Sequence, residues 1–369
     1  MKIYIIAGER SGDLHASNLI SALSRLDPSL EFRGMGGEYM EQSGCVLAAH
    51  YKEIALMGFV EVLLHFRRVL KYLNLIKKDI TAFRPDAIVL VDFAGFNMKI
   101  ARFAHDQHIP VHYYISPKVW AWNQKRAFKL KRYIDRLYAI LPFEPDFFRK
   151  FDWEVDYVGN PLKDEIAKFK PNPDFLNRHQ LGSKPIVALL PGSRKQEVEM
   201  MLKTMVALKE RMDDVAFVVA AVSNLPDEVY LLARKASIPL VYNQTYDLLA
   251  YAKAAVVTSG TATLETALFG VPQLVVYRTS ALSFYIARQL IKVPYISLVN
   301  LIAGREVVKE LIQEDYRNEE VERELSLLIN HEGRIQDVRA GYNEVEERIG
   351  HKKASQETAR LIYTSLEKA

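Results

Sequence analysis

Short apolar runs alternate with longer stretches of helical periodicity along most of the chain, in two successive series. A polar segment rich in Pro and Asn, residues 168–174, separates the two series. Alternation of this kind predicts parallel sheets covered by helices. The apolar runs of the first series are residues 2–7, 31–34, 87–91, 111–115, 136–140 and 156–158. Those of the second series are residues 186–190, 216–221, 239–242, 254–258 and 273–277.

The two series predict an α/β protein of two Rossmann-like, doubly wound domains that face each other across a cleft. We expect residues 1–167 to form the first domain and residues 168–344 the second, with the helix-patterned tail from about 345 to 369 packing back on the first. A chain of 369 residues suits two domains of ~150–200 residues, each with its own core. Ligands of such sheets bind beyond the carboxyl ends of the strands, so the loops after the predicted strands are the expected site.

Composition narrows the classes of function. The single cysteine, Cys45, excludes a disulfide framework and fits a reducing compartment. A net charge of +4 is too small to argue for nucleic acid, but it suits phosphorylated ligands or an anionic surface. The apolar start of the chain is soon interrupted by Glu9 and Arg10, which indicates a strand and not a secretory signal. No apolar run approaches the ~18 residues of a membrane span. We therefore expect the protein in the cytoplasm or on the inner face of a membrane.

Two loops of the first domain carry the candidate catalytic residues. The loop after the first strand holds Glu9, Ser11 and Asp13, and it matches neither a dinucleotide fingerprint nor a Walker-type phosphate loop. A turn capped by Ser11 or Asp13 is the structural alternative. Asp92 ends a buried strand, where a carboxylate is costly unless it caps the next turn or does chemistry. As a functional group it would be a general base whose proton affinity is raised by apolar surroundings.

Three segments of the second domain are candidates for binding a phosphorylated ligand. Residues 258–265 bring glycine and small hydroxylated residues to an expected helix start. The N–H groups there suit a diphosphate, and Glu265 suits sugar hydroxyls. The structural alternative is that the turn is a simple N-cap. Residues 192–194 offer N–H groups and a guanidinium to phosphate, or form an exposed basic loop. Asn300 and Arg305 lie near an expected helix start, which a capped amphipathic helix would also explain. These candidates are Gly192, Ser193, Arg194, Ser259, Gly260, Thr261, Ala262, Thr263, Glu265, Asn300 and Arg305.

Two further segments suggest an acceptor site in the first domain. Trp120, Trp122 and Asn123 follow a predicted strand together with Lys118, and they line a pocket unless the tryptophans pack in the core. Residues 55–72 are apolar with a basic second half, which suits either a bilayer interface or a core helix with an exposed flank. The sequence contains no Asp-x-Asp, His-Glu-x-x-His or cysteine cluster. We therefore expect neither a protein-bound metal nor another cofactor.

Several motifs taken together resemble the lipid-A-disaccharide synthase family, which are glycosyltransferases with two Rossmann-like domains (GT-B type). The matching segments cover nearly the whole chain in the family's order: residues 7–13, 57–62, 116–122, 141–144, 158–161, 190–194, 259–265 and 300–306. The Trp-Ala-Trp block and the Asn-Leu-Ile-Ala-Gly-Arg-Glu block are distinctive of the family, whereas Gly-Thr-Ala-Thr-Leu-Glu is shared more widely among nucleotide-sugar enzymes. Some members carry a second acidic residue where Gly95 stands here, so Asp92 is the only carboxylate of its loop.

The resemblance implies an inverting, metal-independent transfer of 2,3-diacylglucosamine from UDP-2,3-diacylglucosamine to 2,3-diacylglucosamine 1-phosphate. The product would be a β-1′,6-linked disaccharide 1-phosphate, with UDP released, in the synthesis of the lipopolysaccharide anchor of a Gram-negative bacterium. Asp92 would deprotonate the acceptor's 6-hydroxyl and Glu265 would hold the ribose. Glu9, Ser11 and Asp13 would shape the acceptor side.

The same resemblance implies contact with lipid. Residues 57–72 would admit the acyl chains and seat the enzyme on the inner face of the cytoplasmic membrane, through Met57, Phe59, Val60 and Leu63. No nucleic acid partner is implied, and the oligomeric state stays open. Two rival interpretations are an enzyme like UDP-N-acetylglucosamine 2-epimerase, which would not need lipid substrates, and a non-catalytic membrane-associated binding protein.

Overall fold

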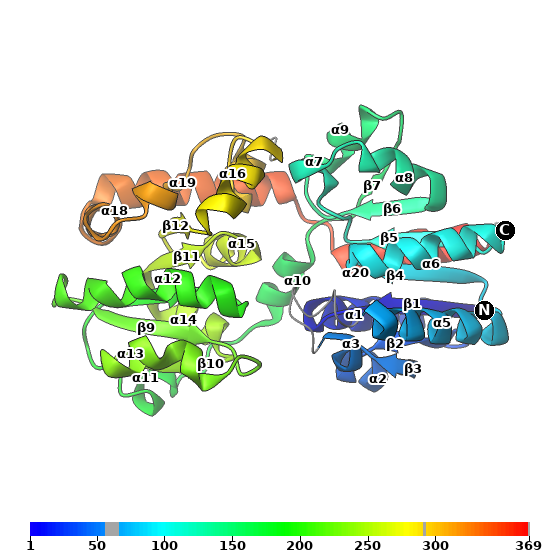
Figure 1. Ribbon diagram of the computed structural model, residues 1–369, viewed down its shortest axis with the longest axis horizontal. Coiled ribbons are helices and arrows are strands. Elements are labelled where there is room, and N and C mark those ends of the chain that lie inside the picture. Colours follow the sequence, from blue (N-terminus) through cyan, green and yellow to red (C-terminus); the bar gives the residue numbers. More distant parts are fainter. Residues whose placement is uncertain (56–65, 291–292, 368–369) are drawn as a thin grey trace. The chain divides into compact units, whose positions relative to one another are not determined.

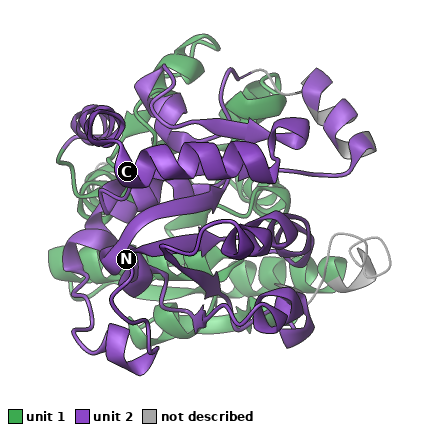
Figure 2. Ribbon diagram, turned by 90° about the vertical axis from the view of Figure 1, so that its left-hand side faces the viewer, with its two compact units in different colours: residues 1–161, 351–369 green, residues 162–350 purple. Residues whose placement is uncertain are grey.

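The chain forms two compact units in the computed structural model, which describes residues 1–55, 66–290 and 293–367. Unit 1 comprises Met1–Pro161 and His351–Ala369, and unit 2 comprises Leu162–Gly350 (Figure 2). The predicted class, two doubly wound α/β domains, is confirmed because each unit is built around its own parallel sheet (Figure 1). The division lies at the start of α10 (Pro161–Lys168), so the Pro/Asn-rich segment belongs to unit 2.

The sheet of unit 1 has the order β3-β2-β1-β4-β5-β6-β7, and all its pairs are parallel. The chain winds outward in one direction from β1 and in the other from β4, so the order reverses between these two strands. Its strands are β1 (Lys2–Ala7), β2 (Glu31–Gly36), β3 (Val46–His50), β4 (Ala87–Val91), β5 (Val111–Tyr114), β6 (Arg136–Ala139) and β7 (Asp156–Tyr157). The edge strand β3 was not predicted.

The helices of unit 1 pack in layers against this sheet. One layer contains α1, which packs against the C-terminal helix α20, and another contains α6, which packs against both α5 and α8. Ala354, Ala359 and Ile362 of α20 belong to the same core as β1 and α1. The helices are α1 (Arg10–Leu26), α2 (Glu38–Gln42), α3 (Lys52–Ala55), α5 (Phe66–Phe83), α6 (Ala94–Asp106), α7 (Val119–Trp122), α8 (Arg126–Tyr133), α9 (Glu144–Arg149) and α20 (Ala354–Leu366).

The sheet of unit 2 has the order β10-β9-β8-β11-β12-β13, again wholly parallel, with the reversal between β8 and β11. The edge strand β13 was not predicted, because its three residues form no long apolar run. The strands are β8 (Ile186–Leu190), β9 (Ala216–Ala221), β10 (Leu240–Tyr242), β11 (Ala252–Thr258), β12 (Gln273–Tyr277) and β13 (Glu310–Ile312). Buried Ile, Val, Leu and Ala residues of β8, β9 and β11 supply much of its core.

Helices flank the second sheet as well, and α19 packs against α15 and α17 of this unit. The tail therefore returns to unit 1 only from His351 onward. The α-helices are α11 (Phe175–Arg178), α12 (Lys195–Ala207), α13 (Leu231–Lys235), α14 (Thr245–Tyr251), α15 (Thr261–Leu268), α16 (Ala281–Leu290), α17 (Leu298–Ala303), α18 (Asn318–Asn330) and α19 (Glu332–Ile349). Three 3-10 turns are η1 (Leu208–Glu210), η2 (Asp227–Tyr230) and η3 (Gln313–Asp315).

Candidate active site

The reversal point of the first sheet brings two candidate loops together. β1 and β4 are neighbours, and Ala7 at the end of β1 pairs with Val91 at the end of β4. Glu9 follows the first strand and Asp92 follows the second. In open α/β sheets the crevice beyond the carboxyl ends of the strands at such a reversal is the usual ligand site.

Asp92 has the electrostatic environment of a general base. Its pKa is raised to about 6, first by burial and then by the negative charge of Glu9. The charge of Lys118 and the backbone N–H of Phe93 act in the opposite direction. A carboxylate with this proton affinity is ionised at neutral pH, yet it binds a proton far better than an ordinary aspartate does.

The backbone at Asp92 is held in a strained conformation. Asp92 and Phe93 both have φ of 47°, in the left-handed region that non-glycine residues rarely adopt. The carbonyl oxygen of Asp92 accepts a hydrogen bond from Asn97 Nδ2 at 2.7 Å and another from the hydroxyl of Tyr113. Both donors are fully buried. Such strain costs of order 1–3 kcal/mol per residue and persists where the surroundings fix it, often at functional sites.

The first loop fits closely against the Asp92 loop. A Cβ atom on Gly8 would lie 2.1 Å from the ring of Phe93, so only glycine fits at this position. Ser11 Oγ donates to Glu9 Oε1 at 2.7 Å, and both side chains are exposed. Ser11 therefore orients Glu9, the carboxylate that acts on Asp92.

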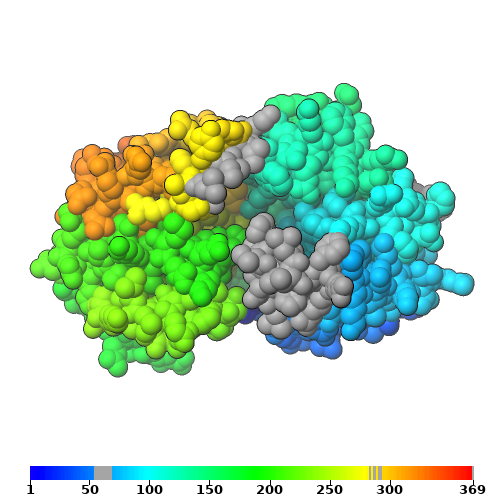
Figure 3. Space-filling view, in the orientation of Figure 1, coloured from blue at the N-terminus to red at the C-terminus, as the bar shows by residue number. Residues whose placement is uncertain are grey.

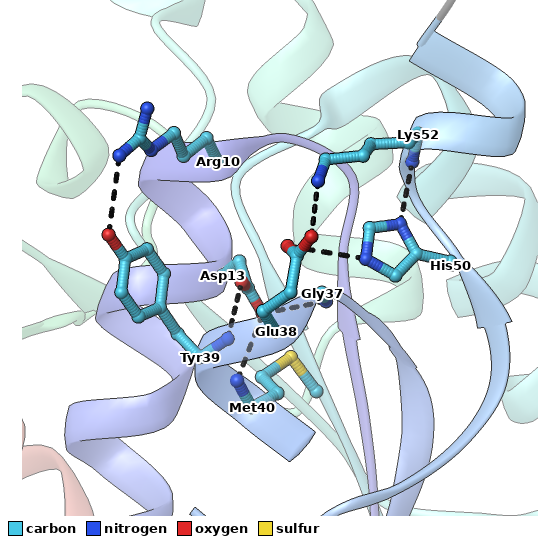
Figure 4. A network of polar contacts seen from close by, with 8 residues as sticks. All are labelled: Arg10, Asp13, Gly37, Glu38, Tyr39, Met40, His50 and Lys52. Carbon is cyan, nitrogen blue, oxygen red and sulfur yellow. Dashed lines mark hydrogen bonds and ion pairs between the residues drawn. The ribbon is translucent and has the colours of Figure 1, made fainter. Parts of the chain in front are cut away.

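Asp13 is a structural residue, which corrects its assignment to the catalytic group. Its fully buried carboxylate accepts hydrogen bonds from the backbone N–H groups of Gly37, Tyr39 and Met40 at 2.7, 3.0 and 3.1 Å (Figure 4). These N–H groups surround the start of α2, so Asp13 anchors that helix to α1. The sequence suggested Asp13 as a cap of its own turn. Asp13 does accept hydrogen bonds from N–H groups at a helix start, but that helix is α2.

The two tryptophans of the predicted acceptor pocket have different surroundings. Trp120 is buried, donates from Nε1 to Glu144 at 3.1 Å and packs edge to face on Phe143, so its assignment to a pocket wall is corrected to a core position. Trp122 is 45% exposed, with the Arg126 guanidinium 5.3 Å from its ring, and Asn123 is also exposed. The other acceptor candidates, Met57, Phe59, Val60 and Leu63, lie outside the described residues.

The reversal point of the second sheet carries the predicted phosphate-binding turn. Gly260 is the N-cap of α15, its backbone is extended, and a Cβ atom there would meet nothing within 4 Å. The first N–H groups of a helix have no partner within it, so those of Thr261 and Ala262 are available to an anion. The hydroxyls are already engaged: Ser259 Oγ donates to Ile296 O, and buried Thr263 Oγ1 donates to Gly260 O. The hydroxyls of Ser259 and Thr263 therefore serve the fold, and the backbone N–H groups at the start of α15 are the groups that suit an anion.

Glu265 lies one turn further along α15. Burial raises the pKa of its carboxyl group, and a hydrogen bond from the Tyr246 hydroxyl at 3.0 Å opposes that rise. Tyr246 packs with Phe169 and Phe269, whose rings also contact each other. Sequence reasoning missed Tyr246, because nothing in the chain links it to Glu265 before the fold is known.

The loop after β8 already holds a carboxylate of this chain. Glu197 Oε2 accepts from the N–H groups of Ser193 and Arg194, both at 3.3 Å, and its Oε1 accepts from Arg194 Nη1 at 2.8 Å. Gly192 has φ of 113°, and a Cβ atom there would lie 2.8 Å from Glu197. The groups of Ser193 and Arg194 that were predicted to bind phosphate thus donate to a single carboxylate, that of Glu197.

Asn300 and Arg305 do not have the surroundings that the sequence suggested. Asn300 is fully buried in α17, where its Oδ1 accepts from the N–H groups of Val307 and Val308 and its Nδ2 donates to Val308 O and Glu310. All four hydrogen-bonding capacities of its amide are used, so its assignment as a donor contact is corrected to a structural role.

Arg305 follows the end of α17 and does not begin a helix. Gly304, in the left-handed conformation, ends that helix. The Arg305 side chain is exposed and forms a two-bond ion pair with Glu344 of α19, at 3.0 and 2.7 Å. Such an exposed pair leaves the guanidinium accessible.

Two wider surveys cover the residues that the structure describes. Within 1–55, 66–290 and 293–367, no three His, Cys, Asp or Glu side chains gather in a way that could hold a metal ion. In the same part of the chain, none of the helices combines the length and apolar character required to cross a membrane.

Comparison with known proteins completes the description. A family model described as "Lipid-A-disaccharide synthetase" matches residues 3–362. The lipid-A-disaccharide synthase of Syntrophotalea carbinolica is 38% identical over 370 residues, covering 98% of this chain and 94% of that protein. That of Syntrophus aciditrophicus is 37% identical over 377 residues, covering 100% and 98%.

Solved structures of similar fold are more distant in sequence. The S. aureus MnaA–UDP co-structure has a TM-score of 0.67 at 15% identity, covering 100% of this chain and 98% of that one. The calicheamicin glycosyltransferase CalG4 has a TM-score of 0.62 at 15% identity, with the same coverage. UDP-N-acetylglucosamine 2-epimerases share the fold at 14% identity, which gives the epimerase interpretation no more than a common architecture. From the family match and these relatives, the chain belongs to the lipid-A-disaccharide synthetase family.

Proposed function

We propose that this glycosyltransferase joins two diacylated glucosamine units. It transfers 2,3-diacylglucosamine from its UDP derivative to 2,3-diacylglucosamine 1-phosphate, giving the β-1′,6-linked disaccharide 1-phosphate and UDP. The family match supports the reaction. The observation that carries the mechanism is the half-buried, strained Asp92 at the sheet reversal, with a pKa of about 6.

Inversion at the anomeric carbon requires one displacement. Asp92 takes the proton of the acceptor's 6-hydroxyl as that oxygen forms its bond to the anomeric carbon and the bond to the UDP oxygen breaks. Proton transfer of this kind contributes typically ~10²–10⁴-fold to the rate. Glu9, oriented by Ser11, raises the proton affinity of Asp92 and so makes it a stronger base.

Unit 2 supplies the binding groups for the nucleotide. The free N–H groups at the start of α15 and the helix dipole face the diphosphate and stabilise the charge that develops on departing UDP. Glu265 accepts hydrogen bonds from the ribose hydroxyls. Arg194 and Ser193 bind phosphate when Glu197 releases them, and Arg305 reaches the donor from the end of α17.

Association with the inner face of the membrane rests on the surface of unit 1. The layer of α5, α6 and α8 has only two acidic residues, Asp79 and Asp106, and each is paired with an arginine. Phe128 of α8 is 61% exposed among cations, and this segment lies on the surface, teal in the view of Figure 3. Exposed cations and an aromatic ring suit anionic headgroups. Among the side chains of this layer that the structure describes, the exposed cations are Lys71, Lys78, Lys99, Arg102, Lys129, Lys131 and Arg132.

A UDP-release assay with diacylated donor and acceptor tests the reaction, with non-acylated sugars as the control. We expect release only when both acylated substrates are present. We expect it to persist in excess EDTA, because the sequence contains no Asp-x-Asp motif to hold a metal ion on the diphosphate. Formation of the manno epimer from UDP-N-acetylglucosamine would instead favour the epimerase. Strict dependence on added magnesium would contradict the metal-independent mechanism.

A further inference from the structure

Glu144 is a buried carboxylate that the proposed mechanism does not use. It is 1% exposed and accepts four hydrogen bonds: from the hydroxyl of Ser116, from Trp120 Nε1 at 3.1 Å, and from the N–H groups of Ile140 and Leu141 at 3.0 and 2.9 Å. Burial raises the pKa of this group, and the four donors act against that rise. A charge in the interior is costly, so four dedicated donors indicate that its position matters.

The four donors come from two loops, and two of them bracket one lysine. Ile140 and Leu141 follow β6, whereas Ser116 and Trp120 follow β5. Lys118 lies midway between Ser116 and Trp120, immediately before α7, and its own side chain is exposed. Because Glu144 fixes the chain on both sides of Lys118, it also fixes the backbone position from which the Lys118 side chain extends.

The bracketed loop runs beside Asp92. Tyr114, the last residue of β5, pairs with Val91, and the N–H of Asp92 donates to Tyr114 O at 3.1 Å. Lys118 is close enough that its charge opposes the effects of burial and of Glu9 on Asp92. Tyr113 is a further titratable neighbour, and its hydroxyl donates to the Asp92 carbonyl.

We propose that Glu144 is a positioning residue that holds Lys118 beside Asp92, and that Lys118 keeps this base ionised in the free enzyme at neutral pH. Glu9 and burial make Asp92 a strong base, and Lys118 prevents the same effects from leaving it protonated before substrate arrives. This inference rests on the proposed role of Asp92. Lys118 acts through Asp92, and Glu144 acts through Lys118.

The pH profile of kcat/KM is the direct test, because it reports ionisation in the free enzyme. In Lys118→Met we expect the acid limb to move upward by about half a unit to one unit, as expected for loss of a nearby opposite charge. Added NaCl screens the opposing charges of Glu9 and Lys118 together, so the Lys118→Met limb, which retains only the effect of Glu9, should move downward with salt more than the wild-type limb does. Lys125→Met, which removes an exposed cation of the same segment, is the matched control and should keep the wild-type limb.

Glu144→Gln tests the positioning step, because an amide NH2 accepts no hydrogen bond, so the donors on one of the two carboxylate oxygens lose their acceptor. We expect its limb to move in the same direction, and we expect Lys118→Met/Glu144→Gln to match Lys118→Met alone. A purely structural role for Glu144 would lower Tm without moving the limb, and would overturn this step. If Glu144→Gln does not fold, Trp120→Phe takes its place in the experiment, because this variant removes one of the four hydrogen bonds to Glu144.

The outcomes separate this inference from the proposed function. If Asp92→Asn is inactive while the limb of Lys118→Met stays at the wild-type position, Lys118 has no such role and the base assignment stands. If Asp92→Asn retains activity, the base assignment itself is wrong.

Discussion

The two sheet reversals occupy equivalent places in the two units, yet they are built in opposite ways. The loop after β4 is charged and strained: two residues with positive φ present a carboxylate of raised pKa, held by buried Asn97 and Tyr113. The loop after β11 is uncharged: Gly260 is extended and open, and the neighbouring hydroxyls of Ser259 and Thr263 are satisfied within the fold.

The difference shows how one topology serves two kinds of chemistry. Proton transfer requires a group whose charge is unstable in its surroundings, so a buried carboxylate on a fixed backbone suits it. Binding a diphosphate requires several aligned dipoles and no competing side chain, so a glycine at a helix start suits it. In the proposed mechanism, turnover depends on the first reversal and nucleotide affinity on the second.

The largest effect is expected from a substitution that impairs the first reversal and leaves the second intact. Asp92→Asn should lower kcat/KM by at least ~10²–10⁴-fold, because it removes the base, while UDP affinity measured by calorimetry should stay at the wild-type value. Asp106→Asn, an exposed acidic residue of α6, is the control and should be fully active. Activity of Asp92→Asn within threefold of wild type would remove Asp92 from the mechanism.

A substitution of Asn300 tests whether this residue stabilises the fold or binds the donor. Asn300→Ala leaves the N–H groups of Val307 and Val308 without their acceptor, so the free energy of unfolding in urea should fall by about 2 kcal/mol. UDP affinity of the folded protein should not change. A large loss of affinity without loss of stability would restore Asn300 as a donor contact.

The second reversal has its own test. Glu265→Ala should weaken UDP binding about tenfold, or about 1.4 kcal/mol, because the ribose loses a hydrogen-bonding partner. Glu199→Ala, which removes an exposed carboxylate of α12, is the control. Unchanged UDP affinity in Glu265→Ala would show that the ribose lies elsewhere.

The smallest expected effect concerns the stability of the first reversal. The pKa of Asp92 is about 6 in the folded chain and about 3.9 in an unfolded one, so the folded form binds the proton more tightly. Its contribution to stability is therefore full below pH ~4 and is lost as the pH rises towards ~6. Asp92→Asn should raise stability at pH 7.5 on the order of 1 kcal/mol, allowing for partial screening. The gain in Tm should shrink at pH 5. A gain that is the same at both pH values would have another origin.

Sequence reasoning located the buried strands and the loops that follow them, because long apolar runs are distinctive. It missed β3 and β13, which are edge strands, half-buried and short, so they lack such a run. It placed Asp92 and Gly260 correctly at strand ends. It misassigned Asp13, Trp120 and Asn300, because their partners lie on other elements and become neighbours only in the folded chain.

The return of α20 to unit 1 has a consequence for how the protein is made. Ala354, Ala359 and Ile362 complete the core that β1 and α1 begin, so unit 1 cannot finish folding until α20 has been synthesised. Every residue of unit 2 precedes α20 in the chain, so that unit can fold earlier. A chain that lacked α20 would leave α1 without this packing partner.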